Sequence, residues 1–271
     1  MQVSFWSNMH GQGATSTTTA AVASVIAQNT ALKTLIAHNQ TERSAIEGYL
    51  FKKPKQDVGF RNLNNQGIDA LLRLVKNGRL KSEMIADYTY SVLKNHRMDL
   101  LLGSEKKQKM PREDQELFLS ILGLAKEFYD LIILDVHSGI KENNSLNILK
   151  SSDIIVFCVN QNSLLLDDLA ALFNEYEFLR QKQAAFVLAR YEKHSGITGA
   201  NIARRFGIKK NYVFKIPSSS HLLDALNTGR VYEYVAFNRN AKRGEEKEVL
   251  SSLNRLCEYI VEGCDKSCRL S

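Results

Sequence analysis

The feature that most constrains the fold is a glycine loop close to the start of the chain. A mostly apolar run, residues 3–6, predicts a strand; Gly11 and Gly13 follow, and a run rich in Thr, Ala and Val predicts a helix over 16–28. Strand, glycine loop and helix in this order are typical of a phosphate-binding loop, because the loop N–H groups converge on one point and the helix N-terminus adds partial positive charge. An ordinary turn between a strand and a helix is the alternative interpretation.

The side chains of this loop fit a phosphate-binding loop only in part. Thr15 stands where such a loop carries the hydroxyl that ligates Mg²⁺. Ala14 stands where the pattern Gly-Lys-Ser/Thr carries its lysine. The loop therefore keeps its backbone donors and a hydroxyl, but it lacks the cation that normally neutralises phosphate.

Two later apolar runs predict buried strands. Residues 131–134 and 154–159 are continuously apolar and lie between helical patterns, which is typical of strands covered on both faces of a parallel sheet. Asp135 directly follows the first run, at the carboxyl end of the strand, where α/β folds place ligands. Strands alternating with helices predict an α/β fold, a doubly wound, mostly parallel sheet flanked by helices on both faces, in a single domain over 1–271.

The other elements follow from hydrophobic periodicity. We expect strands over 33–38, 98–102, 185–190 and 212–216, and helices over 68–75, 82–93, 112–127, 141–149, 165–181, 199–206, 220–228 and 245–261. The last helix carries one apolar stripe, formed by Val249, Leu250, Leu253, Leu256 and Ile260. Such a stripe can lie on a membrane, but the mixed charges of the opposite face favour a helix docked on the core.

Composition and charge limit the classes of protein to which this chain can belong. Of 271 residues, 44% are hydrophobic and 24% are charged, as in ordinary globular proteins, and no apolar run is long enough to span a membrane. The net charge is +7, and the segment 52–112 holds fourteen Lys/Arg against six Asp/Glu. Such a segment can make weak, non-specific contact with DNA or an anionic membrane, although a solvated surface is the simpler interpretation. We expect a cytoplasmic protein, with peripheral contact at the inner face of the membrane as an option.

Several segments together resemble the ParA/MinD family of P-loop ATPases, whose members carry a deviant Walker A loop. They occur in the family's order and at its spacing, and they cover most of the chain: the loop 8–16, the strand 129–139 with its Asp-x-x-x-Gly ending, the strand 152–159, the strand 186–191 with the loop 195–198, and Ile216-Pro217 with 225–229. Segments 67–72 and 98–104 look most like the CpaE/TadZ branch, which serves the assembly and polar placement of Tad-type pili.

The resemblance implies ATP or ADP with Mg²⁺ as cofactors. Carried over residue by residue, it assigns cofactor binding to His10, Gly11, Gln12, Gly13, Ala14, Thr15, Ser16, Asp135, Arg190 and Pro217. It assigns metal binding to Thr15 and Asp135.

The chain departs from the family at the groups that assist phosphoryl transfer. The two family lysines become Ala14 and Met9, and the acid at the end of the second strand becomes Asn39. The first family glycine becomes His10, which can supply some positive charge. Because losing one electrostatic donor costs about 10²–10³ in rate, the sequence predicts a weak or inactive ATPase that still binds nucleotide.

Three functions are compatible with this pattern. The first is a nucleotide-binding adaptor with little or no hydrolysis, which dimerises and positions or assembles a pilus or secretion-type machine, like the CpaE/TadZ group. The second is an active ATPase of plasmid or chromosome partition or of division-site placement. The third is a nucleotide-free scaffold with a basic binding surface.

The family also implies an oligomeric state. Its members place the nucleotide at the interface of a face-to-face dimer, so we expect a homodimer whose interface includes residues 8–12 and 137–143. A monomer whose loop faces solvent is the alternative.

Overall fold

A computed structural model describes residues 1–40, 44–51, 66–104, 110–140 and 143–268 of the chain. Its elements, with 3₁₀ helices labelled η, are β1 (Gln2–Trp6), α1 (Thr15–Asn29), β2 (Thr34–His38), α2 (Ala45–Leu50), α3 (Ile68–Lys76), η2 (Ser82–Tyr88), β3 (Tyr90–Leu93), β4 (Met98–Leu100), α4 (Arg112–Phe128), β5 (Leu131–Asp135), α5 (Asn143–Ser151), β6 (Ile154–Val159), α6 (Ser163–Glu175), α7 (Phe178–Gln181), β7 (Gln183–Tyr191), α8 (Gly199–Phe206), η3 (Lys210–Tyr212), β8 (Val213–Pro217), α9 (Ser220–Asn227), α10 (Val231–Asn238) and α11 (Gly244–Cys268).

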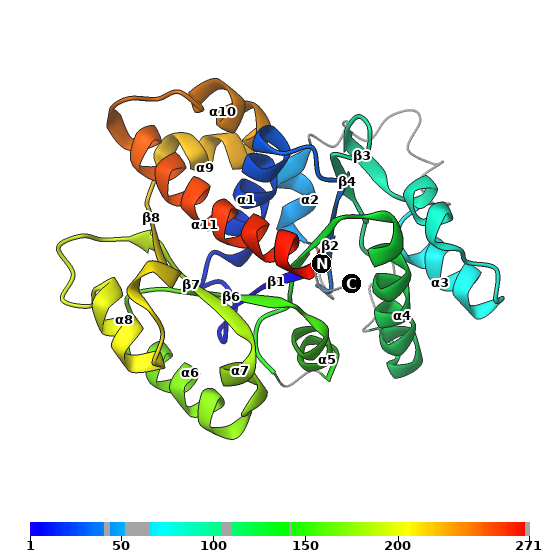
Figure 1. The fold of residues 1–271 in the computed structure, drawn as a ribbon, viewed down its shortest axis with the longest axis horizontal. Coiled ribbons are helices and arrows are strands. Elements are labelled where there is room, and N and C mark those ends of the chain that lie inside the picture. Colours follow the sequence, from blue (N-terminus) through cyan, green and yellow to red (C-terminus); the bar gives the residue numbers. More distant parts are fainter. Residues whose placement is uncertain (41–43, 52–65, 105–109, 141–142, 269–271) are drawn as a thin grey trace.

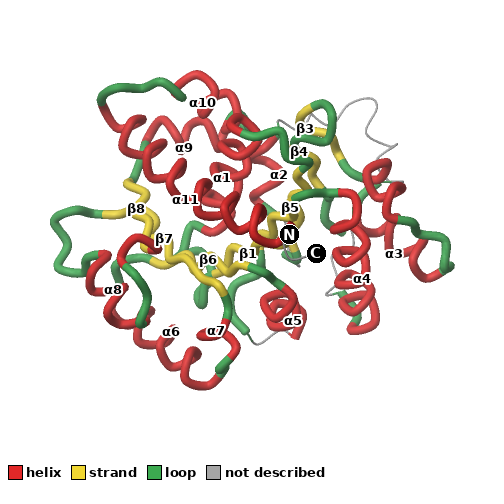
Figure 2. Tube along the Cα trace, in the orientation of Figure 1, coloured by secondary structure: helices red, strands yellow, loops and turns green. Residues whose placement is uncertain are grey.

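Within these residues, eight strands form one sheet in the order β3-β4-β2-β5-β1-β6-β7-β8. Every neighbouring pair is parallel except β3 with β4. Parallel strands need crossover connections, and these are mostly helical here, so the sheet runs through the middle of the molecule with helices on either side (Figures 1 and 2). The predicted doubly wound, mostly parallel α/β fold is confirmed.

The two faces of the sheet carry separate apolar clusters. One face packs against α1, α2, α9, α10 and α11, and the other against α3 to α8 together with η2. Strands β1, β2, β5 and β6 are buried at every residue. The continuous apolar runs therefore mark strands that are covered on both faces, as expected for the centre of a parallel sheet.

The strand order places the glycine loop at a switch point. Strand β1 lies between β5 and β6. The chain crosses from β1 to β2 on the β5 side, whereas β6 lies on the opposite side. The loop after β1 therefore opens between β5 and β6. The carboxyl ends of parallel strands meet at one edge of the sheet, and ligands of such folds bind outside that edge at the switch point. The loop over 7–14 and Asp135 both lie at this edge.

The helix predicted over 82–93 is wrong in its second half. The structure has the short helix η2 and then strand β3, which pairs antiparallel with β4. The connecting turn places Asn95 and His96 at φ 60° and 56°, and Arg97 N–H donates to the Lys94 carbonyl. Two consecutive positive φ angles define a type I′ turn, whose twist suits a hairpin and which asparagine tolerates. The turn therefore overrides the helical periodicity.

The helix predicted over 165–181 is interrupted after Glu175. In α6, the buried positions are Leu166, Leu169 and Phe173, and a continued helix would turn Arg180 toward the core and Leu179 away from it. The break before α7 instead buries Leu179 completely. The other predicted helices and strands are present, and α2 and α10 are additional helices that the sequence did not predict.

The apolar stripe of α11 is docked on the core, as predicted. All five of its residues are buried, Val249, Leu250, Leu253, Leu256 and Ile260, and α11 packs against α1 and β8. In the described ranges, no helix combines the length and apolar character needed to cross a membrane.

Candidate functional site

The glycine loop lies tightly against the end of β6. A Cβ atom on Gly13 would stand 2.4 Å from the carbonyl oxygen of Cys158 and 2.6 Å from the hydroxyl of Ser7, so only glycine fits this position. Gly11 has φ +73°, in the left-handed region that favours glycine. Both glycines are therefore required by the path of the backbone, which is the condition for a close cradle around a ligand.

The start of α1 presents open backbone donors. The residue before the helix, Ala14, has φ 49° and ψ 39°, and its side chain makes no capping hydrogen bond. Within the part of the chain that the structure describes, the N–H groups of residues 13–16 have no hydrogen-bond partner. The first N–H groups of a helix need partners and attract anions. The loop thus has the donor set of a phosphate cradle.

Asp135 faces this cradle from the neighbouring strand β5. The Ser16 hydroxyl donates to its Oδ2 at 2.6 Å, while Oδ1 is buried without a partner among the described residues. Burial raises the pKa of Asp135 to about 6, against the opposing effects of the Ser16 hydrogen bond and of His38 and His10. A buried, unpartnered carboxylate oxygen beside a hydroxyl suits Mg²⁺, which prefers hard oxygen ligands.

The hydroxyl that contacts Asp135 belongs to Ser16 rather than to Thr15. The Thr15 side chain lies next to Cys158 instead, where burial raises the pKa of the thiol and the hydroxyls of Thr18 and Thr15 oppose that rise. Cys158 is fully buried, as its place in an apolar strand predicts. The structure therefore adds Ser16 to the side chains that could hold a metal together with Asp135.

Three histidines, His10, His38 and His137, lie in the segments around this carboxylate. The rings of His10 and His137 lie 6.0 Å apart, centre to centre. His38 ends β2 in register with Asp135, and its Nε2 lies 3.3 Å from Glu47 Oε1. Sequence reasoning gave His38 no role and His137 only an interface role. The signal that could have found both is the alignment of strand ends across a parallel sheet.

Asn39 joins three segments around the site. Its Oδ1 accepts the His137 backbone N–H at 2.6 Å, and its Nδ2 donates to Ser145 Oγ at 3.2 Å. The Ser145 hydroxyl in turn donates to the His137 carbonyl at 3.0 Å. The side chain at this strand end therefore both donates and accepts, which a carboxylate cannot do. Asn39 fixes the loop that follows Asp135.

Arg190 and Pro217 lie farther along the same edge. Arg190 is exposed and sits in a bulge of β7 at φ 52°, and Pro217 ends β8 opposite Tyr191. Strand β7 is separated from β1 by β6, and β8 lies one strand beyond it. The structure thus brings residues 10–16 close to Asp135, whereas Arg190 and Pro217 lie on β7 and β8, farther from the loop.

The basic segment 52–112 is described only in part. Residues 52–65 and 105–109 lie outside the described residues, and these two stretches hold seven of its fourteen Lys/Arg.

No family model and no curated protein matches this sequence. Solved structures do match over nearly the whole chain. A ParA family ATPase from Chlorobium tepidum is 15% identical with a TM-score of 0.70, covering 93% of this chain and 98% of its own. The septum site-determining protein MinD from Pyrococcus horikoshii, complexed with Mg-ADP, is 18% identical with a TM-score of 0.68, covering 96% and 95%. A putative plasmid partition protein from Borrelia burgdorferi, bound to AMPPNP, is 17% identical with a TM-score of 0.66, covering 95% and 98%.

These similarities define the class of fold. The sheet, its strand order and the loop at the switch point are those of a P-loop nucleotide-binding fold. More particularly, the chain has the fold of the ParA/MinD ATPases, as expected from its sequence segments.

Proposed function

We propose that this protein binds ATP or ADP with Mg²⁺ at the loop of residues 10–16 and hydrolyses it slowly, using the nucleotide as a structural ligand. The observation that carries the proposal is the buried, unpartnered Oδ1 of Asp135, which lies beside the Ser16 hydroxyl at the mouth of a loop without lysine. The MinD structure with Mg-ADP and the partition protein with AMPPNP support a nucleotide on this fold.

The residues present fit the phosphate and metal ends of such a ligand. The open N–H groups of residues 13–16 would receive phosphate oxygens, aided by the partial positive charge of α1. Asp135, with the hydroxyls of Ser16 and Thr15 as candidate partners, would hold Mg²⁺. When bound, the metal would supply positive charge against the β- and γ-phosphates.

Slow hydrolysis follows from what this chain lacks. Phosphoryl transfer depends on positioning and on neutralising charge in the transition state. Ala14 and Met9 supply no charge, and Asn39 is committed to hydrogen bonds with the loop after Asp135. His10 and His137 flank the site with their ring centres 6.0 Å apart, but a histidine does not carry the permanent charge of a lysine.

The proposed homodimer would form across the loop face. Met9 is 42% exposed and Leu164 is 71% exposed, which is unusual for large apolar side chains in this protein. Their segments are tied together, because Asn8 Nδ2 donates to the Leu165 carbonyl at 2.9 Å. Exposed apolar side chains beside a ligand loop support a dimer contact that includes residues 8–12 and 137–143, of which 141–142 lie outside the described residues.

The proposed biological role is that of an adaptor that positions or assembles a pilus or secretion-type machine. The two segments that resemble the CpaE/TadZ branch lie side by side: Ile68 N–H donates to the Leu102 carbonyl at 3.0 Å, and the Ser104 hydroxyl donates to Asp69. The two segments therefore form one local unit of the fold, which supports treating their resemblance to this branch as a single feature.

An active partition or division-site ATPase is the second candidate. The names of the similar structures, a plasmid partition protein and a septum site-determining protein, favour it. A phosphate-release assay separates the two candidates, because the adaptor is expected to turn over far more slowly than the median enzyme rate of about 10 per second.

Thermal unfolding with increasing ATP or ADP, each with Mg²⁺, tests the nucleotide proposal. A ligand that binds only the native state raises the melting temperature as its concentration rises. We expect such a rise for the wild type and its loss in Ser16→Ala/Asp135→Asn. A melting temperature that stays constant up to millimolar nucleotide would instead support the nucleotide-free scaffold.

A further inference from the structure

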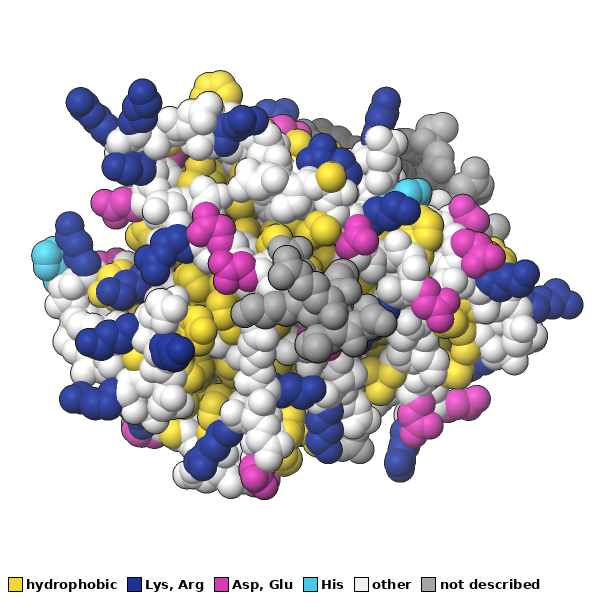
Figure 3. All heavy atoms as spheres, viewed as in Figure 1, with side chains coloured by type: hydrophobic (Ala, Val, Ile, Leu, Met, Phe, Trp, Pro, Cys, Tyr) yellow, Lys and Arg dark blue, Asp and Glu magenta, His cyan; other side chains and the backbone are white. Residues whose placement is uncertain are grey.

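A cavity lies at one edge of the sheet, beside the strand β8. Its volume is about 820 Å³, and it is lined by the loop after β7, the end of β8 and the start of α11. Five of the residues that line it are basic, namely Lys193, Lys215, Lys242, Arg243 and Lys247. Figure 3 shows Lys and Arg side chains gathered on this side of the molecule, where Figure 1 places β8, α8 and the start of α11.

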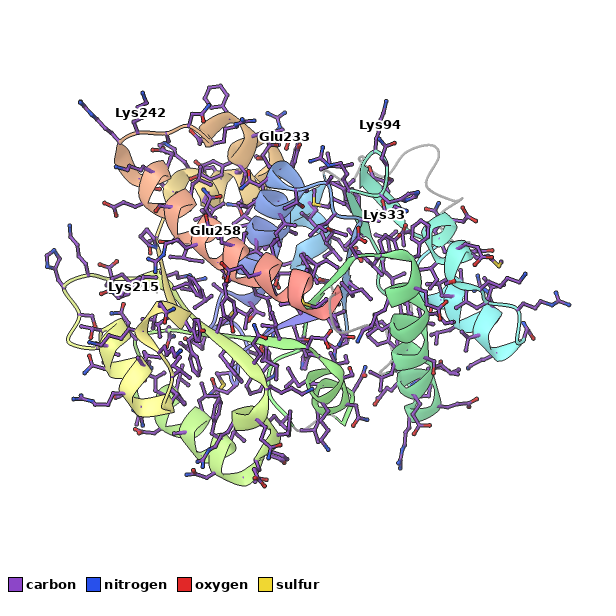
Figure 4. All side chains as sticks on the ribbon, viewed as in Figure 1. Lys33, Lys94, Lys215, Glu233, Lys242 and Glu258 are labelled. Atoms are coloured by element: carbon purple, nitrogen blue, oxygen red, sulfur yellow. The ribbon has the colours of Figure 1, made fainter. Side chains whose placement is uncertain are left out.

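These cations outnumber the two carboxylates that line the same cavity, Glu192 and Glu248. In the described part of the chain, none of the five forms an ion pair, although Glu192 and Glu248 also line the cavity. Like charges gathered around one hollow repel each other, so the arrangement favours a bound anion. The cations come from three separate segments of the chain, and Figure 4 labels two of them, Lys215 on β8 and Lys242 before α11.

The surroundings of Lys215 restrict the position of its side chain at this cavity. Its Nζ lies 5.2 Å from the centre of the Tyr191 ring. A Cβ atom on Gly199 would stand 2.8 Å from Lys215 Cε, so the glycine at the start of α8 leaves room for the lysine stem. The ring and the glycine limit the directions in which this charge can move, which lowers the entropy cost of holding an anion.

Hydroxyl groups and a helix start add neutral donors to the same hollow. Ser218, Ser251 and Ser252 line the cavity, and so does Gly244, where α11 begins. Hydroxyls and the first backbone N–H groups of a helix also hydrogen-bond to phosphate oxygens. The volume lies within the range of small-molecule sites, about 300–1,000 Å³.

We propose that this cavity binds a compact small molecule that carries two or more phosphate groups. Several phosphate charges would match the excess of cations over carboxylates, and a concave site suits a small ligand better than the convex backbone of duplex DNA. Pro217 lines this cavity and also belongs to the predicted nucleotide contacts. The experiment must therefore separate this cavity from the loop site at Asp135.

Isothermal titration with inorganic tripolyphosphate, without Mg²⁺, tests this proposal on the full chain. The cavity variant is Lys215→Gln/Lys247→Gln, and its matched control is Lys81→Gln/Lys94→Gln, two exposed lysines outside the cavity. Each charge-assisted contact is strong relative to a neutral one, so we expect at least tenfold weaker binding in the cavity variant and unchanged binding in the control.

Three results would overturn the proposal. One is equal weakening in the cavity and control variants, which would mark diffuse attraction to a positive protein. Another is tripolyphosphate binding that the cavity variant leaves unchanged, which would place the anion outside this cavity, as at the glycine loop. The third is cavity-dependent binding of a short DNA duplex, of anionic vesicles or of an acidic peptide without binding of tripolyphosphate.

Discussion

At the scale of single residues, Asp135 is central to the proposed ligand site and to the pH dependence of stability. Its carboxylate is fully buried, with one oxygen on Ser16 and the other without a partner in the described residues. Burial disfavours the charged form, so the pKa of Asp135 rises from 3.8 to about 6 in the folded protein. The stability gained from the raised pKa is present at acid pH and is lost as the pH rises through about 6.

Replacing Asp135 by Asn should therefore stabilise the ligand-free protein at neutral pH more than at acid pH. The gain of the variant over the wild type should grow by about 1 kcal/mol between about pH 5 and pH 7.5. Urea unfolding of both proteins in the presence of a chelator measures it. A gain that does not change over this range would contradict the burial of an ionisable Asp135.

Asn39 is the second residue for which a prediction follows, and its hydrogen bonds are revealed only by the structure. Asn39→Asp would restore the acid of the resembled family but would remove the donor to Ser145 Oγ. We expect a loss of about 1 kcal/mol in the free energy of unfolding and no gain in phosphate release. Asn29→Asp is the matched control, because Asn29 donates to Asn254 at the surface, away from the site. A rise in turnover with Asn39→Asp would show that only the acid was missing.

At the scale of elements, the junction of the loop with α1 stores strain. Ala14 adopts φ 49°, which costs an L-residue with a Cβ roughly 1–2 kcal/mol and costs glycine little. Ala14→Gly should raise the free energy of unfolding by about 0.5–1 kcal/mol. Ala171→Gly, at an exposed position inside α6, should lower it by about the same amount. Chemical denaturation gives both values, and equal signs for the two variants would refute the strained conformation.

The sequence predicted elements where its pattern was long and periodic. Continuous apolar runs identified β5 and β6, and the stripe of α11 predicted its docking on the core. The sequence pattern did not predict features that depend on tertiary contacts. The break before α7 is set by burial of Leu179, and the hairpin of β3 and β4 is set by its type I′ turn.

The sequence predicted the site residues that form continuous motifs, but only part of the contacts between distant segments. The loop residues and Asp135 were identified, since their motifs are continuous in sequence. The hydrogen bonds of Ser16 with Asp135 and of Asn39 with Ser145 join residues more than one hundred positions apart. Contacts of this kind follow from the strand order 2-5-1-6, which a sequence pattern does not encode locally.

At the scale of the whole molecule, the proposed dimer depends on the loop face. Met9→Glu would place a charge at the exposed apolar position of the loop and should shift the protein toward monomer. Phe237→Glu is the matched control, because Phe237 is 90% exposed on α10, away from the loop. Sedimentation with and without ATP and Mg²⁺ measures the assembly. A wild type that stays monomeric under both conditions would remove the dimer from the account.

The central claim is that a lysine-free glycine loop still holds a nucleotide through backbone N–H groups, Ser16 and Asp135. Calorimetric titration of ATP into the wild-type protein, with and without Mg²⁺, tests it most directly. The account predicts saturable binding of one nucleotide per chain that is strengthened by Mg²⁺ and that loses this strengthening in Asp135→Asn. Absence of binding at millimolar ATP, or binding that Mg²⁺ and Asp135→Asn leave unchanged, would contradict it.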